Sequence, residues 1–298
     1  MSELSQLLSR SRDHFGQGQS NGFVETSIPG VRLFWSDHPV ARSPMLYEAG
    51  IIIIGQGHKI GRIDGKSFRY DSGHYLVVSA PTPAECESFA TVDDPLLGIF
   101  IDVDLSDLQL LVAKVSKYST FSHDSESKLY SNIEPVQLDH DMEDTAIRLL
   151  KAMLSPLEGE ALGTNLVQEI MFRALQGERG SALYTLTQHN SHYARIAKAL
   201  SHVHKNFKSP IRVEDLSESS NMSVSVFHRT FKKITGETPL QYLKKTRLNK
   251  AKDLIVDNGL RAGVAASEVG YESVSQFSRE FKRYFGKAPT DMYSLKQK

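Results

Sequence analysis

Cysteine is nearly absent from this sequence, in which Cys86 is the single cysteine among 298 residues. One cysteine excludes an intramolecular disulfide and fits a reducing cytoplasm. Long hydrophobic runs are missing as well: the most apolar short run, Ile51 to Ile54, is far too short to cross a bilayer, and glycines flank it as they would a buried strand. The N-terminus lacks a basic start followed by an apolar block, so no secretory signal is expected. We therefore expect a cytoplasmic protein with no membrane partner.

Net charge is also missing, because 35 Lys and Arg balance 35 Asp and Glu. The two signs are unevenly distributed along the chain. Residues 192–298 carry 20 basic and 10 acidic side chains, a net charge of +10, which leaves 15 basic and 25 acidic, or −10, for residues 1–191. An acidic body joined to a basic folded tail indicates a polyanionic partner such as nucleic acid, although a solvated charged face is the alternative.

One phrase occurs twice in the basic tail. SVSVFHRTFKKITGETP at 223–239 and SVSQFSREFKRYFGKAP at 273–289 are identical at nine of seventeen positions. The apolar residues recur at three- and four-residue spacing, which predicts two helices with one buried face each. The buried sets are Val224, Phe227, Phe231 and Ile234 in the first copy and Val274, Phe277, Phe281 and Tyr284 in the second. Ser223 is a predicted N-cap, and Gly236 and Gly286 lie where left-handed C-caps are expected.

A shorter helix and a tight turn precede each copy, which is the helix-turn-helix plan. We place the two units at 213–235 and 262–285. Between them, Thr238 and Gln241 form a predicted capping box around Pro239 and open a helix that continues to about Val256. Eighteen residues make a rod of about 27 Å. Such a rod can hold two recognition helices roughly 34 Å apart, so that both enter successive major grooves on one face of a duplex.

These residues resemble the AraC/XylS family of transcription regulators. The resemblance covers about 195–295 and includes the A-x-x-x-G-Y turn from Ala266 to Tyr271, the Phe277 and Phe281 pair, and the F-G-x-x-P ending at 285–289. It implies an all-α double helix-turn-helix domain over 192–298 that binds double-stranded promoter DNA. The resemblance also favours an activator, which would have RNA polymerase as a partner.

The family's base-contacting positions fall on polar residues of both predicted recognition helices: Ser225, His228, Arg229, Ser275, Gln276, Ser278 and Arg279. Arginine can bind guanine O6 and N7 together, and Gln, His and Ser can reach other base-edge groups. Residues farther along the helices are better placed for phosphates, namely Lys232, Lys233, Lys282 and Arg283. Two alternatives stay open: the lysines can serve solubility alone, and Arg229 or Arg279 can pair with a carboxylate such as Glu218 or Glu268.

Residues 22–104 read as short strands broken by turns, with Asp64-Gly65 as a hairpin signal. Strands without intervening helices predict a small β-barrel or sandwich. The stretch resembles the cupin-like N-terminal domain of one AraC subfamily. We therefore expect an α+β multidomain protein: a cupin-like β-barrel at 1–105, a helical dimerisation and linker region at 106–190, and the all-α DNA-binding domain.

The barrel is expected to bind a small-molecule effector rather than to catalyse a reaction, because barrel interiors hold small molecules. The expected lining, with plain core packing as the alternative, is Tyr47, Ile52, Ile54, Tyr75, Val77 and Cys86. Metal cupins usually open with H-x-H, whereas His58 and His74 stand alone, so neither a metal nor a cofactor is expected. A cupin-type enzyme with an appended DNA-binding domain remains the rival reading. A sensor of electrophiles or redox state through Cys86 is another, although Glu85 and Glu87 oppose a reactive thiolate.

Residues 106–190 turn helical, with a polar loop at 118–135 and a linker at 177–191. Two apolar stripes stand out: one of Ile147, Leu150 and Leu154, and one of Val167, Ile170, Met171, Ala174 and Leu175. Each stripe can cover the barrel or the other stripe, or it can form a homodimer interface. A nonspecific nucleic-acid protein is the third functional reading, and two helices with different polar faces argue against it. The sequence thus predicts an effector-controlled regulator that reads an asymmetric DNA site.

Overall fold

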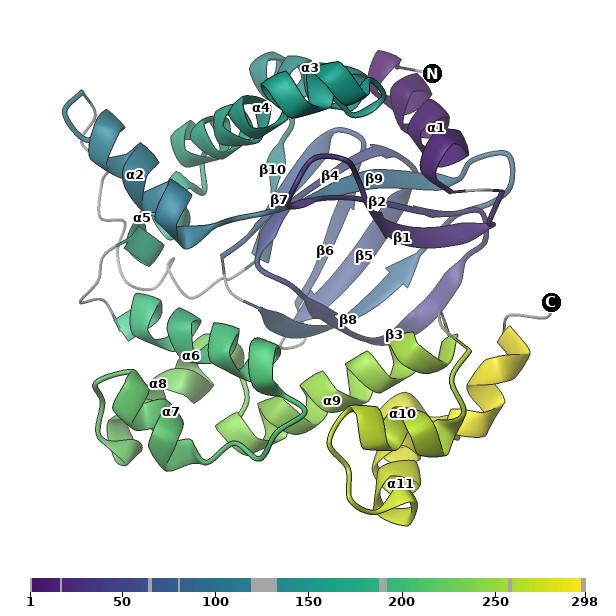
Figure 1. Ribbon diagram of the computed structural model, residues 1–298, viewed down its shortest axis with the longest axis vertical. Coiled ribbons are helices and arrows are strands. Elements are labelled where there is room, and N and C mark those ends of the chain that lie inside the picture. The colour runs from purple at the N-terminus through teal and green to yellow at the C-terminus, as the bar shows by residue number, and fades with distance from the viewer. Residues whose placement is uncertain are drawn as a thin grey trace. The chain divides into compact units, whose positions relative to one another are not determined.

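The computed structural model describes residues 2–16, 18–63, 66–79, 81–118, 133–187, 192–256 and 259–295. The chain forms two compact units. The first comprises Met1–Arg42, Glu48–Thr82 and Cys86–Ser191, and the second comprises Ser43–Tyr47, Pro83–Glu85 and His192–Lys298. The first unit contains both β-strands and helices. Residues 192–295 of the second unit are helical (Figure 1). The predicted α+β multidomain class is confirmed.

The first unit contains a six-stranded sheet in the order β1-β2-β9-β4-β7-β10. Its strands are β1 (Asn21–Glu25), β2 (Val31–Ser36), β9 (Leu96–Asp102), β4 (Gly50–Gln56), β7 (His74–Val78) and β10 (Ile133–Gln137). Neighbouring strands are antiparallel, with Ile52 of β4 opposite Phe100 of β9 and Leu76 of β7. The isoleucine run that the sequence reads as a buried strand is therefore the centre of this sheet.

A four-stranded sheet has the order β3-β8-β5-β6. It contains β3 (Val40–Tyr47), β8 (Thr82–Ser88), β5 (His58–Ile63) and β6 (Lys66–Asp71). The last two strands pair antiparallel from His58 opposite Asp71 to Ile63 opposite Lys66. The predicted hairpin is confirmed by this register, although its two turn residues, Asp64 and Gly65, lie outside the described residues.

The two faces of the six-stranded sheet meet different neighbours. Phe34 on one face lies under Lys59 of the four-stranded sheet, with the Lys59 Nζ 5.7 Å from the ring centroid. On the opposite face, a Cβ added to Gly55 would lie 2.3 Å from Leu8, and one added to Gly177 would lie 2.4 Å from the Tyr75 hydroxyl. Strand alternation therefore directs one set of side chains between the two sheets and the other set toward helices.

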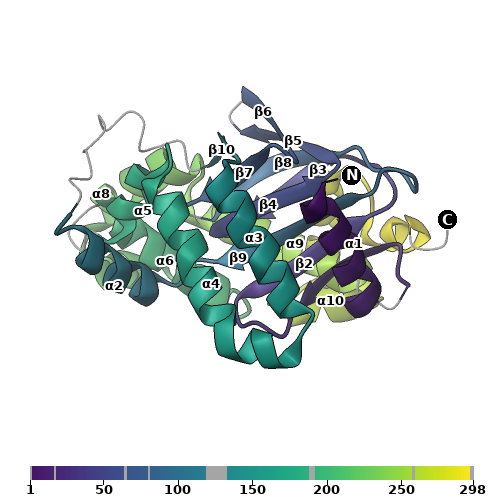
Figure 2. The same ribbon diagram turned by 90° about the horizontal axis from the view of Figure 1, so that it is seen from above.

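The helices of the first unit are α1 (Glu3–Phe15), α2 (Leu105–Val115), α3 (His140–Met153), α4 (Pro156–Gln176) and α5 (Gly180–Thr187). Side-chain oxygens cap four of them, from Ser2, Asp104, Asp139 and Ser155. Figures 1 and 2 both show α3 and α4 side by side, with α1 next to α3. The long helices and α1 thus form a layer that covers the sheet.

Four elements of this unit differ from the sequence predictions. The expected loop at 118–135 ends in the edge strand β10, where Ile133 and Val136 are buried and Pro135 is tolerated because an edge strand has one unpaired side. The expected linker at 177–191 contains α5, whose Leu183 and Leu186 are buried. Helix α1 and strand β1 were not predicted. The remaining linker residues, 188–191, lie outside the described residues.

The second unit contains α6 (His192–Asn206), α7 (Val213–Ser219), α8 (Val224–Thr235), α9 (Pro239–Val256), α10 (Ala262–Glu268) and α11 (Val274–Phe285), followed by the 3₁₀ segment η1 (Pro289–Leu295). The predicted recognition helices are α8 and α11, and the predicted rod is α9. The amide of Gln241 donates to Thr238 Oγ1 at 3.4 Å, so Thr238 caps α9 as expected. Gly236 and Gly286 end α8 and α11 with φ of 74° and 73°.

Candidate nucleic-acid interface

Each helix-turn-helix unit is built on a pair of buried phenylalanines. The rings of Phe227 and Phe231 lie 5.4 Å apart and those of Phe277 and Phe281 lie 5.3 Å apart, and all four side chains are fully buried. Phe231 also packs edge-to-face on Tyr242 of α9, at 5.5 Å. These aromatic contacts hold each recognition helix against its neighbours, so that its polar side faces outward.

The turns of the two units differ by one residue. The amide of Met222 donates to the Ser217 carbonyl, and the amide of Tyr271 donates to the Ala266 carbonyl, both at 3.0 Å. These matched bonds are 49 residues apart, whereas the recognition helices begin 50 residues apart at Val224 and Val274. The second turn therefore contains one additional residue before α11.

Both turns need a backbone with positive φ. Asn221 supplies it in the first helix-turn-helix at 49°, and Gly270 supplies it in the second helix-turn-helix at 82°. A Cβ at position 270 would lie 2.2 Å from the carbonyl oxygen of Lys208, so no larger residue fits there without a shift. Arg247 of α9 fixes the same region, because its guanidinium donates to the carbonyls of Phe207 at 2.7 Å and Ser209 at 3.0 Å.

The residues predicted to contact bases lie on the polar faces of α8 and α11. Five are exposed, namely Ser225, Arg229, Ser275, Gln276 and Arg279, while His228 and Ser278 are half-buried. The four residues predicted to contact phosphate are exposed farther along the same helices: Lys232, Lys233, Lys282 and Arg283. Each helix thus carries the predicted set on its outer side.

The ion-pair alternative for the two arginines has no support in the described part of the chain. No ion pair of Arg229 or Arg279 is formed among these residues, and Glu268 instead pairs with Lys208, whose Nζ lies 2.9 Å from Oε2. Both guanidinium groups therefore remain accessible for another partner.

Two valines were assigned wrongly to the buried faces. Val224 is 41% exposed and Val274 is 49% exposed, and each is the first residue of its helix. Tyr284, also expected to be buried, is only half-buried, and its hydroxyl accepts a hydrogen bond from Asn249 Nδ2 at 3.2 Å. Burial raises the pKa of Tyr284 to about 12.

Glu280 of α11 is a centre of hydrogen bonding that the sequence did not reveal. It accepts from the Tyr271 hydroxyl at 2.8 Å, from Lys244 Nζ of α9 at 3.2 Å and from Gln276 Nε2 at 3.2 Å. Burial raises the pKa of Glu280, but the hydrogen bonds from Gln276, Tyr271 and Lys244 hold it below its ordinary value. Its carboxylate is therefore ionised at neutral pH and connects the turn, the rod and the recognition helix.

The six residues expected to line an effector cavity are all buried, on strands β3, β4, β7 and β8. The strand register places them on different faces. Ile51 lies opposite Val77 and Ile53 lies opposite Tyr75, so Tyr75 and Val77 point away from the side of Ile52 and Ile54. The six cannot all line one space between the sheets. Of this set, Cys86 is 5% exposed, which agrees with the packing alternative for its thiol.

One cation and two aromatic rings lie on the side of the six-stranded sheet that faces the other sheet. Arg32 lies between the Phe23 and Phe100 rings, 5.0 and 4.3 Å from their centroids. Its guanidinium pairs with Glu48 at 2.8 Å and Asp102 at 2.5 Å.

The described ranges contain no group of three or more His, Cys, Asp or Glu side chains placed to hold a metal. His58 stacks on Phe89, and His74 contacts Asp71 at 2.9 Å.

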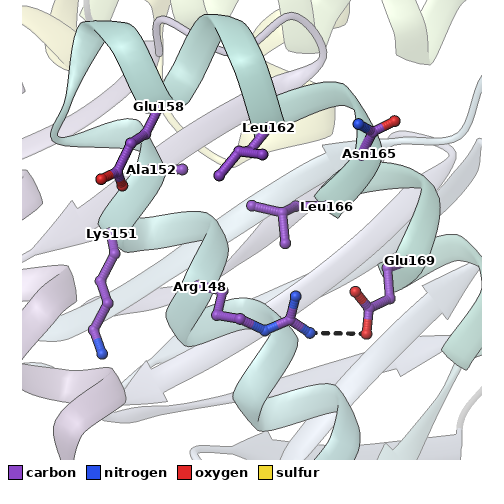
Figure 3. Close-up of a pocket in the computed structure, with 8 residues that line it drawn as sticks. All are labelled: Arg148, Lys151, Ala152, Glu158, Leu162, Asn165, Leu166 and Glu169. Carbon is purple, nitrogen blue, oxygen red and sulfur yellow. Dashed lines mark hydrogen bonds and ion pairs between the residues drawn. The ribbon is translucent and has the colours of Figure 1, made fainter.

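Two of the pockets on the first unit have a defined lining among the described residues. One lies between α3 and α4, has a volume of about 330 Å³ and is shown in Figure 3. There Arg148 points from α3 toward Glu169 of α4, 2.8 Å away, with Leu162 and Leu166 beside them. The other, of about 420 Å³, lies among polar residues that include Ser5, Gln56, Arg69, Asp71 and Asp94. Neither is lined by the six predicted effector residues.

The helical stripes of residues 141–176 are mostly buried within the unit. Leu150, Ile170, Met171, Ala174 and Leu175 are all buried, whereas Leu157 and Leu162 on α4 are exposed. The stripes therefore serve packing, and an interface between copies would need the outer side of α4. Across the described ranges, no helix is both long and apolar enough to span a membrane.

A family model for the N-terminus of AraC-type transcriptional regulators matches residues 27–182, more than half of the chain, and a helix-turn-helix domain model matches residues 216–294. The chain belongs to the AraC/XylS family of transcription regulators. Among curated AraC-family and other regulators, AlkR from Acinetobacter baylyi is 37% identical over 97 residues, 33% of this chain and 32% of that protein. The activator RhaS from Escherichia coli is 28% identical over 148 residues, 49% of this chain and 52% of that protein.

The chain thus spans about a third to a half of the curated relatives it matches. Solved structures of ToxT from Vibrio cholerae share the fold over most of the chain. An apo variant gives a TM-score of 0.63 at 10% identity, covering 91% of this chain and 99% of ToxT. The wild type bound to an unsaturated fatty acid gives 0.58 at 12% identity, covering 92% and 96%. The AraC-family layout predicted from the sequence, a β-rich N-terminal domain before a helix-turn-helix domain, is confirmed.

Proposed function

We propose that this AraC-family chain is a sequence-specific DNA-binding transcription regulator, an activator whose N-terminal domain binds a small effector. The observation that carries the proposal is the matched exposure of Arg229 and Arg279 on two recognition helices, each free of ion pairs within the described residues. An arginine in the major groove can bind guanine O6 and N7 together. Two such helices in one chain can bind one duplex in the way that a dimer of single units does.

The proposed interface divides its work between two kinds of residue. Ser225, His228 and Arg229 on α8, with Ser275, Gln276, Ser278 and Arg279 on α11, would contact base edges. Lys232, Lys233, Lys282 and Arg283 would contact phosphates, which adds affinity but no sequence preference. Because Val226 and His228 on α8 stand where Gln276 and Ser278 stand on α11, the two helices would read different bases.

This proposal is tested by substituting one residue of each kind. Arg229→Ala or Arg279→Ala should cost about 1–3 kcal/mol on the selected site and relax the preference at one base pair. Lys282→Ala should weaken binding to selected and random duplexes alike. Binding to both duplexes is measured by fluorescence anisotropy at one salt concentration. Equal losses on both duplexes for both kinds of change would refute the assignment.

The N-terminal domain is proposed to regulate this binding through a small molecule. An effector changes DNA binding only if it binds one arrangement of the protein more tightly than the other. Ile52 and Ile54 lie on the same face of the six-stranded sheet as Arg32 and Phe100, so an effector bound at that face would meet apolar side chains and a paired charge. Ile52→Trp should abolish an effector response while leaving DNA binding without effector unchanged.

RNA polymerase and a second copy of the chain are the remaining proposed partners. The homodimer proposal is supported by the exposed Leu157 and Leu162 on α4, beside a groove whose rim carries Lys151 and Glu158. Opposite charges at the rim can pair with a second copy turned by a twofold rotation. Sedimentation of the wild type and of Leu157→Glu tests this, since the variant should be monomeric where the wild type is a dimer.

A further inference from the structure

Gln276 and Glu280 lie one turn apart on α11 and are joined by a hydrogen bond. Gln276 Nε2 donates to Glu280 Oε1 at 3.2 Å, and Gln276 itself is exposed on the outer side of the helix. Glu280 is held in turn by Tyr271 and Lys244, and its side chain is only 13% exposed. The carboxylate is therefore a fixed point beside a residue that reaches toward the proposed DNA surface.

The ionised carboxylate sets the orientation of the Gln276 amide. A carboxylate can only accept hydrogen bonds, so the nitrogen of the amide, and not its oxygen, must face Glu280. Turning the amide over would direct its carbonyl oxygen at a negative charge. The hydrogen trans to the carbonyl is the one that Glu280 can take, which leaves the carbonyl oxygen and the other hydrogen together on the outer edge.

That outer edge matches one base. Adenine presents N7 as an acceptor and the N6 amino group as a donor, and glutamine binds both at once. Guanine presents two acceptors, N7 and O6, so a carbonyl oxygen directed at O6 would be repelled. An amide free to turn over could offer its nitrogen to guanine instead, and the carboxylate prevents this.

We propose that Glu280 is a positioning residue that makes Gln276 selective for adenine over guanine at one base pair of the site. The inference rests on the proposed function, in which α11 reads bases. The first helix-turn-helix has no equivalent pair: Val226 and Thr230 stand at the matching positions of α8. The selectivity therefore belongs to the half of the site that α11 contacts.

The first experiment uses the wild-type full chain and altered DNA. Duplexes that bind the protein are selected from a random-sequence pool, and the position with an adenine preference that Gln276→Ala abolishes is identified. At that position adenine should be favoured over guanine on the order of tenfold. Replacing adenine by 7-deazaadenine, which lacks N7, or by purine, which lacks the N6 amino group, should each weaken binding. Insensitivity to both replacements overturns the inference.

The second experiment compares Glu280→Gln with Tyr271→Phe. A glutamine at 280 can donate or accept, so the Gln276 amide can turn over and the adenine preference should fall roughly tenfold, with other positions unchanged. Tyr271→Phe removes another hydrogen bond to Glu280 but keeps the carboxylate beside Gln276, so the preference should persist. A Glu280→Gln variant that keeps the preference, or that loses affinity equally for every sequence, overturns the inference.

The two levels of the proposal fail in different ways. A wild-type protein that selects no sequence at all would refute sequence-specific binding itself. A wild-type protein that selects a site, but whose Gln276-dependent preference is unaffected by the analogues and by Glu280→Gln, would refute only the role of Glu280. If Glu280→Gln does not fold, insensitivity of the wild type to both analogues would still overturn the inference.

Discussion

The Tyr271 hydroxyl donates to Glu280 across 2.8 Å and so connects the second turn to its recognition helix. A hydrogen bond to a charged group contributes roughly 1.5–3 kcal/mol. Tyr271→Phe should therefore lower the local stability of α11 by about that amount at pH 7. Faster amide hydrogen exchange in α11, with unchanged exchange in α8, is the expected result, because α8 has no such bond. Equal exchange in the variant and the wild type would show that the bond is not stabilising.

The same carboxylate predicts a pH dependence. The pKa of Glu280 is held below its ordinary value, so its contribution to stability is present above the pKa of the unfolded chain, about 4.3, and is lost as the pH falls through the folded pKa. Exchange in α11 should accelerate more steeply below pH 4.5 in the wild type than in Tyr271→Phe, after correction for intrinsic rates. Parallel profiles would contradict this assignment.

Gly270 and Gly286 are a matched pair for a test of the turn. Both have positive φ, but a Cβ on Gly270 would lie 2.2 Å from the Lys208 carbonyl, and one on Gly286 would have no atom within 4 Å among those described. Gly286→Ala should cost about 1–2 kcal/mol from backbone conformation alone. Gly270→Ala should cost clearly more, because the backbone must also move. Urea unfolding followed by helical circular dichroism compares them, and equal costs would contradict the close approach.

Phe281 is a buried apolar residue of α11 and Val274 is an exposed one, so substitutions at the two positions should differ in their effect on stability. Phe281→Ala should destabilise the second unit by about 3–5 kcal/mol, because its ring is fully buried against Phe277. Val274→Ala should change stability by less than about 1 kcal/mol, because half of that side chain is already exposed. Thermal unfolding of the full chain distinguishes them. A large loss of stability in Val274→Ala would instead show that Val274 is buried, as the sequence pattern predicted.

Lys282 is expected to contribute to the salt dependence of DNA binding. Removing one phosphate contact should lower the slope of log affinity against log salt by about one. Lys282→Ala should show this reduction, and Lys66→Ala, which changes an exposed lysine of the first unit, should not. Titrations at several salt concentrations provide the slopes. A slope unchanged by Lys282→Ala would favour solubility as the role of that lysine.

The helical part of the chain was the more predictable from sequence. The bounds of α8 and α9 agree with the prediction, because helical periodicity, the Thr238 cap and the two left-handed glycines are local signals. Val224 and Val274 were misplaced because periodicity identifies a helical face but not how deeply the first residue of a helix is buried. Helix α1 could have been found, since Ser2 precedes leucines at positions 4, 7 and 8 that share one face.

The β-rich part was less predictable because strand pairing is not local. Sequence placed most strands but could not show that Ile133 and Val136 return to pair with β7 after α2. The proposed effector lining mixed the two faces of the sheet for the same reason: Tyr75 and Ile52 come from neighbouring strands whose register was unknown. The network of Glu280 was equally hidden, since its partners lie on three different elements.

The central claim is that one chain reads two different half-sites with α8 and α11. Its most direct test is selection of bound duplexes from a random-sequence pool by the wild type, Arg229→Ala and Arg279→Ala. The account predicts a non-palindromic site of two unlike parts, centred about one helical turn, or roughly 10 base pairs, apart. Arg229→Ala should lose base preference in one part only, and Arg279→Ala in the other. Selection of no preferred sequence, or loss of the same base preference in both variants, would contradict it.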